Sequence, residues 1–280
     1  MISKPPQQIG TASRWHFRLA AGALAAAATA EFGFQSRCGA AGAGPLGWLA
    51  LLGAASWALG LIWRERVGVL RAWMCFVWVV MSGLVLMRLG LRWGSLSGGL
   101  AFTGMEAWRF LGVPLSAPLL WWVMAGGGYL VVEGLWGEWR AGVSALTALV
   151  AVQQALMVLP FQVSRGRGYW RWDGAPETAQ APLVAMPWAA LGGWFVMGLG
   201  LALGLVVLGD NWSRPETRTR RQAWVPAAVL LVVTAVCLSA NLAAALPLAV
   251  IFSTVNLGFF GAVVIWYLRD RSDRRRIPGA

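Results

Sequence analysis

Eight apolar runs make up most of this chain, and most of them are about as long as a membrane-crossing helix. They lie at residues 19–30, 46–63, 70–89, 111–135, 141–161, 184–209, 224–245 and 247–268. A helix needs about 20 apolar residues to cross the hydrocarbon core of a bilayer. Since the chain has 280 residues, little sequence remains for a domain outside the membrane. The sequence therefore predicts an all-α, polytopic transmembrane helix bundle of about eight spans, which forms a single domain over residues 1–280.

The composition agrees with a protein that is surrounded by lipid. Charged residues make up 12% of the chain and hydrophobic residues 58%, whereas soluble domains contain about 25% charged residues. These proportions exclude a soluble enzyme. Any chemistry must take place inside the helix bundle or at its edge.

The segment 90–110 differs from the runs on either side of it. It is short and is interrupted by Gly94, Gly98, Gly99 and Arg109. Irregular backbone at membrane depth is tolerated where it lies within protein or lines a cavity. We therefore expect a short re-entrant or interfacial segment that lines a cavity, with a ninth helix as the alternative.

The first apolar run allows two interpretations. It follows Lys4, Arg14 and Arg18 and ends in Ala28-Thr29-Ala30, which resembles the cleavage site of a signal peptide. The later helices would direct the chain to the membrane without a cleaved leader. We therefore expect the run to be the first membrane helix.

The charges are distributed unevenly between the two sides of the predicted bundle. The formal net charge is +12, and 16 of the 23 Lys and Arg residues fall on one side when the eight spans are numbered in order. Positive loops stay in the cytoplasm and contact anionic lipid headgroups. We therefore expect an integral protein of a bacterial cytoplasmic membrane with a cytoplasmic basic segment at each end, 1–18 and 269–280. Membrane lipid, and not nucleic acid, is the expected partner of these charges.

Several classes of cofactor protein have no support in the sequence. His16 is the only histidine, so the repeated imidazole ligands of haem carriers are missing. Cys38, Cys75 and Cys237 are far apart and form no C-x-x-C pair. Nucleotide-binding, hydrolase and zinc-protease motifs are also absent from the sequence. We predict no metal site and no cofactor.

Two groups of small residues predict close helix packing. They are Gly126-Gly127-Gly128 and the segment from Gly200 to Gly204. Small residues let helix backbones approach one another in lipid. A transporter is a weaker interpretation, because the two halves show no clear inverted repeat and few charges lie within the runs.

Proline and tryptophan mark three blocks in the middle of the chain. The first is Leu111-Gly112-Val113-Pro114-Leu115-Ser116-Ala117-Pro118-Leu119-Leu120-Trp121. The second is Pro160 followed by Gly168-Tyr169-Trp170-Arg171-Trp172, and the third is Met186-Pro187-Trp188-Ala189-Ala190-Leu191-Gly192-Gly193-Trp194.

In this order and spacing, the blocks resemble the membrane carotenoid-biosynthesis family that includes the bisanhydrobacterioruberin hydratases. The resemblance covers about residues 85–200. It implies a protein that hydrates, or otherwise processes, the end group of an acyclic carotenoid dissolved in the membrane. It also implies substrate contacts from the three blocks, by Pro114, Trp121, Tyr169, Trp170, Trp172, Pro187 and Trp194.

The chain departs from the family pattern mainly at polar positions. Met87 and Arg88 stand where the family has a carboxylate, and Gln154 and Leu159 replace aspartates ahead of the middle proline. Ala190 replaces the asparagine of the last block. These losses favour a second interpretation, in which the protein is a non-catalytic carotenoid-binding or structural subunit of a membrane complex, for instance a photosynthetic one, or a homo-oligomer.

Hydration of an alkene requires an acid, and the two candidates that we single out are Glu106 and Asp173. Glu106 lies in the segment 90–110, and Asp173 follows the Gly-Tyr-Trp-Arg-Trp block. A carboxylic acid in an apolar pocket can stay protonated near neutral pH and donate its proton. Structural roles are the alternative, because Glu106 could pair with Arg109 and Asp173 could cap a turn. Glu133 and Glu138, at the end of the run 111–135, are expected to face headgroups.

Nineteen tryptophans allow two roles. Those near run ends or scattered through the runs, among them Trp48, Trp57, Trp63, Trp73 and Trp78, are expected to be interfacial or lipid-facing anchors. Those in the three blocks provide flat walls for a polyene, with core packing as the alternative for each of them.

Overall fold

The structure is a computed structural model that describes residues 11–38, 44–93, 100–102, 109–136, 170–172, 188–209, 224–243 and 247–276. The described helices are α1 (Thr11–Cys38), α2 (Gly44–Val67), α3 (Val69–Trp93), α4 (Ser116–Trp136), α7 (Trp188–Gly209), α8 (Trp224–Ala243) and α9 (Pro247–Arg276). Four short strands accompany them, β1 (Leu100–Phe102), β2 (Arg109–Phe110), β3 (Val113–Pro114) and β4 (Trp170–Trp172). The predicted all-α architecture is confirmed.

Five of these helices, α2, α3, α4, α8 and α9, are long and apolar enough to cross a membrane. The outer face of α3 shows why the surroundings must be lipid, because Leu70, Trp73, Met74, Val77 and Met81 are all exposed there. Soluble monomers rarely expose so large a contiguous apolar surface. The chain is therefore a polytopic integral membrane protein.

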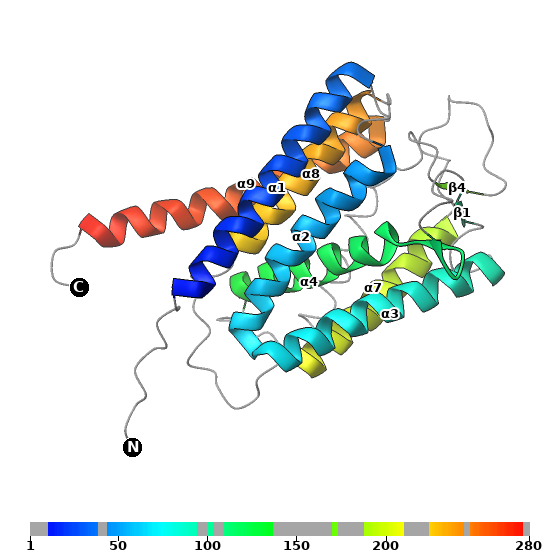
Figure 1. Cartoon of the computed structure of the whole chain (residues 1–280), viewed down its shortest axis with the longest axis horizontal. Coiled ribbons are helices and arrows are strands. Elements are labelled where there is room, and N and C mark those ends of the chain that lie inside the picture. The colour runs from blue at the N-terminus through cyan, green and yellow to red at the C-terminus, as the bar shows by residue number, and fades with distance from the viewer. Residues whose placement is uncertain are drawn as a thin grey trace.

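Helix α4 is the centre of the bundle. It packs against α2, α3, α7 and α8, and Figure 1 shows it (green) crossing behind α2 and between the neighbouring helices. A Cβ atom on Gly127 would lie only 3.1 Å from Leu230 of α8 and 3.3 Å from Leu59 of α2. The predicted close packing at the glycine triplet is thus confirmed at Gly127.

Helices α2 and α3 form an antiparallel pair joined by a single residue, Gly68. Its φ angle of 86° lies in the left-handed region that favours glycine. Its amide donates to the carbonyl oxygen of Arg64 (2.9 Å), and its carbonyl accepts from the amide of Ala72 (3.0 Å). These bonds end α2 and begin α3 within one sharp turn (Figure 1).

The predicted run 111–135 begins as a β-hairpin and not as a helix. Strands β2 and β3 pair through Arg109 with Pro114 and Phe110 with Val113. The residues between them, Leu111 and Gly112, have φ angles of 53° and 79°. Two consecutive positive φ angles are the conformation of a type I′ turn, which matches the twist of a two-stranded hairpin. Helix α4 consequently starts at Ser116.

Part of the segment 90–110 is extended. Helix α3 continues to Trp93, and residues 100–102 and 109–110 lie in strands β1 and β2. A ninth helix through these strand residues is therefore wrong. That the segment is re-entrant or interfacial stays a prediction.

The remaining runs correspond to described helices, with one exception. Helix α1 contains the run 19–30 and packs against α2 and α8. It is not among the five helices that are long and apolar enough to cross a membrane, and it carries Arg18 and Glu31. The run 141–161 lies outside the described residues. The number of eight spans therefore stays a prediction.

Candidate functional site

Strand pairing joins two of the segments singled out in the sequence. Strands β1 and β4 are antiparallel, with Leu100 opposite Trp172, Ala101 opposite Arg171 and Phe102 opposite Trp170. The segment 90–110 and the Trp-Arg-Trp block are about 70 residues apart in the sequence, and the ladder places them side by side near the end of α3. Among the described residues, this is where the structure brings predicted site segments together.

The first block is divided between the hairpin and α4. Pro114 is buried in β3, which packs against both α3 and α4. Trp121 is buried in α4, where its ring lies against Gly83 of α3 at 3.2 Å from the position of an added Cβ. Because Gly83 has no side chain, there is room for the indole of Trp121, which packs between α3 and α4.

The structure describes only some of the other predicted site residues. Trp170 and Trp172 lie in β4, and Trp194 lies in α7. Glu106, Tyr169, Asp173 and Pro187 lie outside the described residues. The catalytic and substrate-binding roles of all of these residues stay predictions.

Two arginines hold the β segments near the end of α3. Arg109 donates from Nη2 to the carbonyl oxygen of Phe102 (2.9 Å), which ties β2 to β1. The guanidinium of Arg88 lies 3.1 Å from where a Cβ on Gly112 would be, so α3 reaches the hairpin turn through this side chain. A larger residue at position 112 would meet Arg88.

A cluster of aromatic side chains lies where α2, α3 and α4 meet. The rings of Trp63 and Tyr129 are stacked, with centroids 5.4 Å apart and an interplanar angle of 26°. Trp122 lies 6.0 Å from Trp63 and 5.3 Å from Phe76, which meets it edge to face. Trp63 Nε1 donates to the carbonyl oxygen of Gly126 (3.3 Å), so its polar group is satisfied in the bundle interior. We call these four residues the aromatic cluster.

An ion pair closes one end of the aromatic cluster. Arg66 of α2 binds Glu133 of α4 through both of its terminal nitrogens. The guanidinium also lies 5.5 Å from the ring centre of Trp63 and 5.4 Å from that of Tyr129, within cation–π range. The expectation that Glu133 faces headgroups is wrong, because its side chain is only 7% exposed. A buried carboxylate needs such a partner to offset the loss of its hydration.

The anchor role expected of the scattered tryptophans holds for only some of them. Trp57 and Trp73 are exposed on α2 and α3. Trp78 is partly exposed, but its indole lies against Gly204 of α7. Trp48 and Trp63 are buried, and Trp63 belongs to the aromatic cluster. The anchor interpretation is therefore wrong for Trp48 and Trp63.

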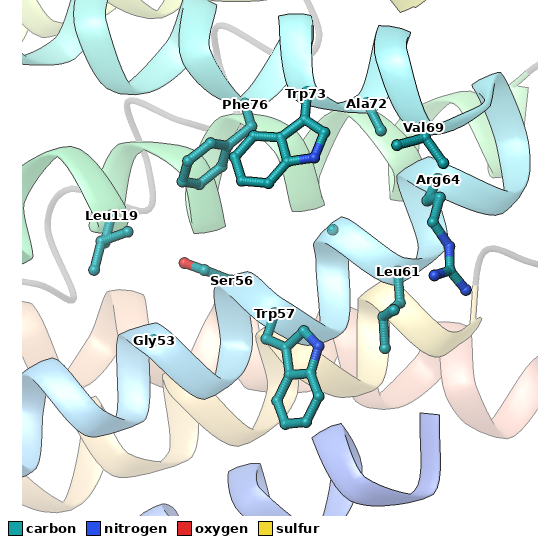
Figure 2. A pocket seen from close by; sticks show the side chains of 11 residues that line it. Gly53, Ser56, Trp57, Leu61, Arg64, Val69, Ala72, Trp73, Phe76 and Leu119 are labelled. Atoms are coloured by element: carbon teal, nitrogen blue, oxygen red, sulfur yellow. The ribbon is translucent and has the colours of Figure 1, made fainter. Parts of the chain in front are cut away.

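A cavity of about 360 Å³ lies between α2 and α3, next to the aromatic cluster. Gly53, Ser56, Gly60 and Arg64 line it from α2, and Val69, Ala72, Trp73 and Phe76 from α3, together with Trp57, Leu61 and Leu119. Figure 2 shows Trp73 and Phe76 extending from α3 towards α2. Phe76 contacts Trp73 edge to face at 5.6 Å and also belongs to the aromatic cluster. The cavity and the cluster thus share one aromatic wall.

Comparison with known proteins identifies the family. The model of the family described as carotenoid biosynthesis protein matches residues 46–260, which is well over half of the chain. No curated protein and no solved structure gives a significant match. The chain belongs to this carotenoid biosynthesis protein family. It is thus a membrane protein related to carotenoid biosynthesis, and the match extends beyond the three blocks to include α2, the α2–α3 cavity and α8.

Three polar features of this carotenoid-biosynthesis protein are not evident from the three blocks. The Arg66–Glu133 pair is one, and the Ser56 hydroxyl in the cavity wall is another. The third is a buried set between α1 and α8, in which Gln35 donates to Glu31 (3.4 Å) and accepts from Ser239. An ionisable residue inside an apolar run is a functional candidate. That signal could have identified Glu133, which lies inside the run 111–135, whereas Glu31 directly follows the run 19–30. A serine in an apolar run gives no such signal.

The described residues offer few ligands for a metal. No three His, Cys, Asp or Glu side chains in the described ranges lie close enough to hold an ion. Cys75 and Cys237 are buried on α3 and α8, and neither of them forms a disulfide.

Proposed function

We propose that this membrane protein adds water to the end group of an acyclic carotenoid that is dissolved in the bilayer. Membership of the carotenoid biosynthesis family over residues 46–260 is the observation that carries the proposal. The resemblance of the three blocks to the hydratases of that family narrows the reaction to the end group.

The reaction needs three things from the protein. An acid protonates the terminal C=C bond, which leaves a tertiary carbocation on the more substituted carbon. A held water molecule then forms the C–O bond and loses a proton, so that the net change is addition of one water. Aromatic faces can stabilise the cation by about 2 kcal/mol when they are shielded from water.

We assign the proton donor to Glu106, with Asp173 as the second acid that could hold the water or accept its proton. The strand that precedes Glu106 pairs with the strand that ends immediately before Asp173. Pro114, Trp121, Tyr169, Trp170, Trp172, Pro187 and Trp194 would line the path of the polyene.

Neither buried carboxylate among the described residues is a better choice of acid. Glu133 is ion-paired with Arg66, and a carboxylate held in an ion pair is a poor proton donor. Glu31 lies on α1, outside the family match, and is hydrogen-bonded to Gln35. We therefore keep Glu106 and Asp173 as the proposed acids.

A second candidate function is carotenoid binding without turnover, as a subunit of a membrane complex. The observation that favours it is the α2–α3 cavity, whose lining contains no carboxylate and, apart from the indoles of Trp57 and Trp73, only two polar side chains, Ser56 and Arg64. The replacements at Met87, Arg88, Gln154, Leu159 and Ala190 point the same way. A protein that only holds a polyene needs apolar and aromatic walls and no acid.

Expression in cells that accumulate lycopene, followed by chromatography of the pigments, separates the two functions. The wild-type chain is expected to give a hydroxylated carotenoid. Loss of a proton donor should cost at least about 100-fold in rate, so Glu106→Gln should remove this product, and Asp173→Asn should reduce it. Glu65→Gln, a change of the same type at the end of α2, is the control and should leave the product unchanged. Lycopene that co-purifies with the wild-type protein without any new product would support the binding function instead.

A further inference from the structure

The small-residue face of α2 creates the α2–α3 cavity and is not used for helix packing. Gly53, Ser56 and Gly60 lie on one side of α2, and a Cβ added to either glycine would meet nothing within 4 Å. Gly127 of α4 differs, because Leu59 and Leu230 occupy the space where its side chain would be. Small residues in membrane helices usually allow close packing. Here they leave a preformed space.

The Ser56 hydroxyl is the polar group inside this space. Ser56 is only 7% exposed, and its Oγ has no hydrogen-bond partner among the described residues. Figure 2 shows the oxygen directed into the cavity, towards the side of Phe76 and Leu119. A buried hydroxyl without a hydrogen-bond partner is unfavourable, and hydrocarbon lipid offers no partner. A molecule that occupies the cavity could therefore supply the hydrogen-bond partner that Ser56 Oγ lacks.

We propose that the α2–α3 cavity binds the hydroxyl-bearing end of a linear isoprenoid chain, and that Ser56 Oγ hydrogen-bonds that hydroxyl. The inference rests on the proposed function, because hydration of a carotenoid end group yields such a hydroxyl. The site would thus hold the product of the reaction, and the unhydrated carotenoid would bind less tightly because it has no polar atom to offer.

The shape of the cavity fits a linear end. Its lining runs along α2 from Gly53 to Arg64, about 16 Å at the rise of an α-helix, or roughly half the ~30 Å hydrocarbon core. Its mouth is bordered by Trp73, which is 60% exposed, so a lipid-dissolved molecule can enter from the side. The rings of Trp73 and Phe76 provide flat apolar walls for a polyene.

The position of Ser56 favours this occupant over a phospholipid. The polar atoms of a phospholipid lie at the membrane interface, where Arg64 could bind them. Ser56 lies two turns away along α2, about 12 Å deeper. An acyl chain would therefore leave Ser56 Oγ unpaired. The α2 backbone at Ser56 is also held in place, since Trp122 Nε1 donates to the Ser56 carbonyl oxygen (3.4 Å).

A direct binding measurement tests the inference. The full-length protein in lipid nanodiscs is titrated with lycopene and with an acyclic carotenoid that carries one terminal tertiary hydroxyl, using quenching of tryptophan fluorescence. One net hydrogen bond is worth about 1 kcal/mol, so the wild-type Kd should be roughly 5-fold lower for the hydroxylated compound. Ser56→Ala should abolish this preference and leave the Kd for lycopene unchanged.

Two glycine variants locate the site. Gly60→Leu places an apolar side chain in the cavity, at a position where an added Cβ meets nothing within 4 Å, and should weaken binding of both carotenoids at least 10-fold. Gly200→Leu is the matched control, because Gly200 also has nothing within 4 Å of an added Cβ but lies on the exposed face of α7. It should bind like the wild type.

Three results would overturn the inference. They are equal wild-type affinity for the two carotenoids, a preference that survives Ser56→Ala, and wild-type binding by Gly60→Leu. A phospholipid that co-purifies and is lost in Arg64→Gln and Gly60→Leu, but not in Ser56→Ala, would assign the cavity to lipid instead. Because the hydroxylated compound is supplied ready-made, this assay does not depend on turnover, and the lycopene-cell experiment can fail or succeed independently of it.

Discussion

Arg66 of α2 and Glu133 of α4 form an ion pair inside the bundle, and the Arg66 guanidinium also contacts the rings of Trp63 and Tyr129. The pair joins the two helices that, together with α3, build the aromatic cluster. The cluster in turn shares Phe76 with the α2–α3 cavity. The ion pair therefore positions the walls of the cavity although it does not line it.

Removing one partner of this pair should destabilise the protein strongly. Arg66→Met leaves the Glu133 carboxylate buried without a cation, which typically costs 3–5 kcal/mol. The double variant Arg66→Met/Glu133→Leu should recover much of this loss, because two apolar residues can replace a buried pair. Thermal unfolding of the purified protein in detergent measures both effects.

Arg64→Met is the control for the ion-pair experiment. Arg64 lies two residues before Arg66, is half-buried, and has no ion pair among the described residues. We expect its unfolding temperature to stay near that of the wild type. If Arg66→Met were as mild as Arg64→Met, the pair would not hold α2 to α4.

The hairpin before α4 depends on Gly112. Gly112→Ala should cost about 1–2 kcal/mol, because the φ angle of 79° lies in the left-handed region. The added methyl group would also press against the Arg88 guanidinium. Urea or thermal unfolding of the purified protein gives the change in stability.

Gly22→Ala is a suitable comparison for the hairpin variant. Gly22 lies inside α1 with open space around it, so alanine should stabilise the helix by about 0.5–1 kcal/mol. Opposite signs for the two substitutions are expected. A loss of stability in both would mean that the turn geometry is not the cause.

The helices could be predicted from the sequence because each apolar run is long and is bounded by charge, glycine or proline. Helices α2, α3 and α9 cover their predicted runs, and α8 covers the run 224–245 as far as Ala243. The start of α4 was not predicted, because the run 111–135 was defined by its apolar pattern alone, although Gly112, Pro114 and Ser116 are signals for a turn and a helix start. The left-handed turn at Leu111 and Gly112 interrupts the helix without interrupting the apolar pattern.

The inner and outer faces of the helices could not be predicted for a related reason. Lipid and the bundle interior are both apolar, so buried and lipid-exposed positions carry the same residue types. Trp57 and Trp63 are both tryptophans of one run, yet Trp57 is exposed and Trp63 is fully buried. The β1–β4 pairing could not be predicted either, because Phe102 and Trp170 are 68 residues apart in the sequence.

The tryptophans of the blocks should differ in behaviour from those of the core. If Trp172 lines the path of the polyene, Trp172→Ala should lower the carotenoid that is bound or converted while the yield of folded protein stays nearly intact. Trp63→Ala should instead reduce the protein itself, because truncation of a buried tryptophan costs about 3–5 kcal/mol. Pigment absorbance and protein yield are measured on the same preparations. Equal loss of protein and pigment in Trp172→Ala would assign Trp172 to packing.

The orientation in the membrane is the last prediction, and the α2–α3 turn supports it. Arg64, Arg66 and Arg71 surround the Gly68 turn, and positive residues at helix ends favour the cytoplasmic side. In Figure 1 the start of α1, this turn and the end of α9 lie towards the same side of the view.

Reporter fusions can establish this orientation. A reporter that is active only in the cytoplasm should be active after Pro5 and after Gly279, and inactive when inserted at Ala175. Replacing Arg64 and Arg71 with glutamine should weaken the bias, whereas the same change at Arg88 and Arg92 should strengthen it, because those residues lie at the opposite end of α3. Reporter activity at only one terminus would require an odd number of spans and would contradict the count of eight.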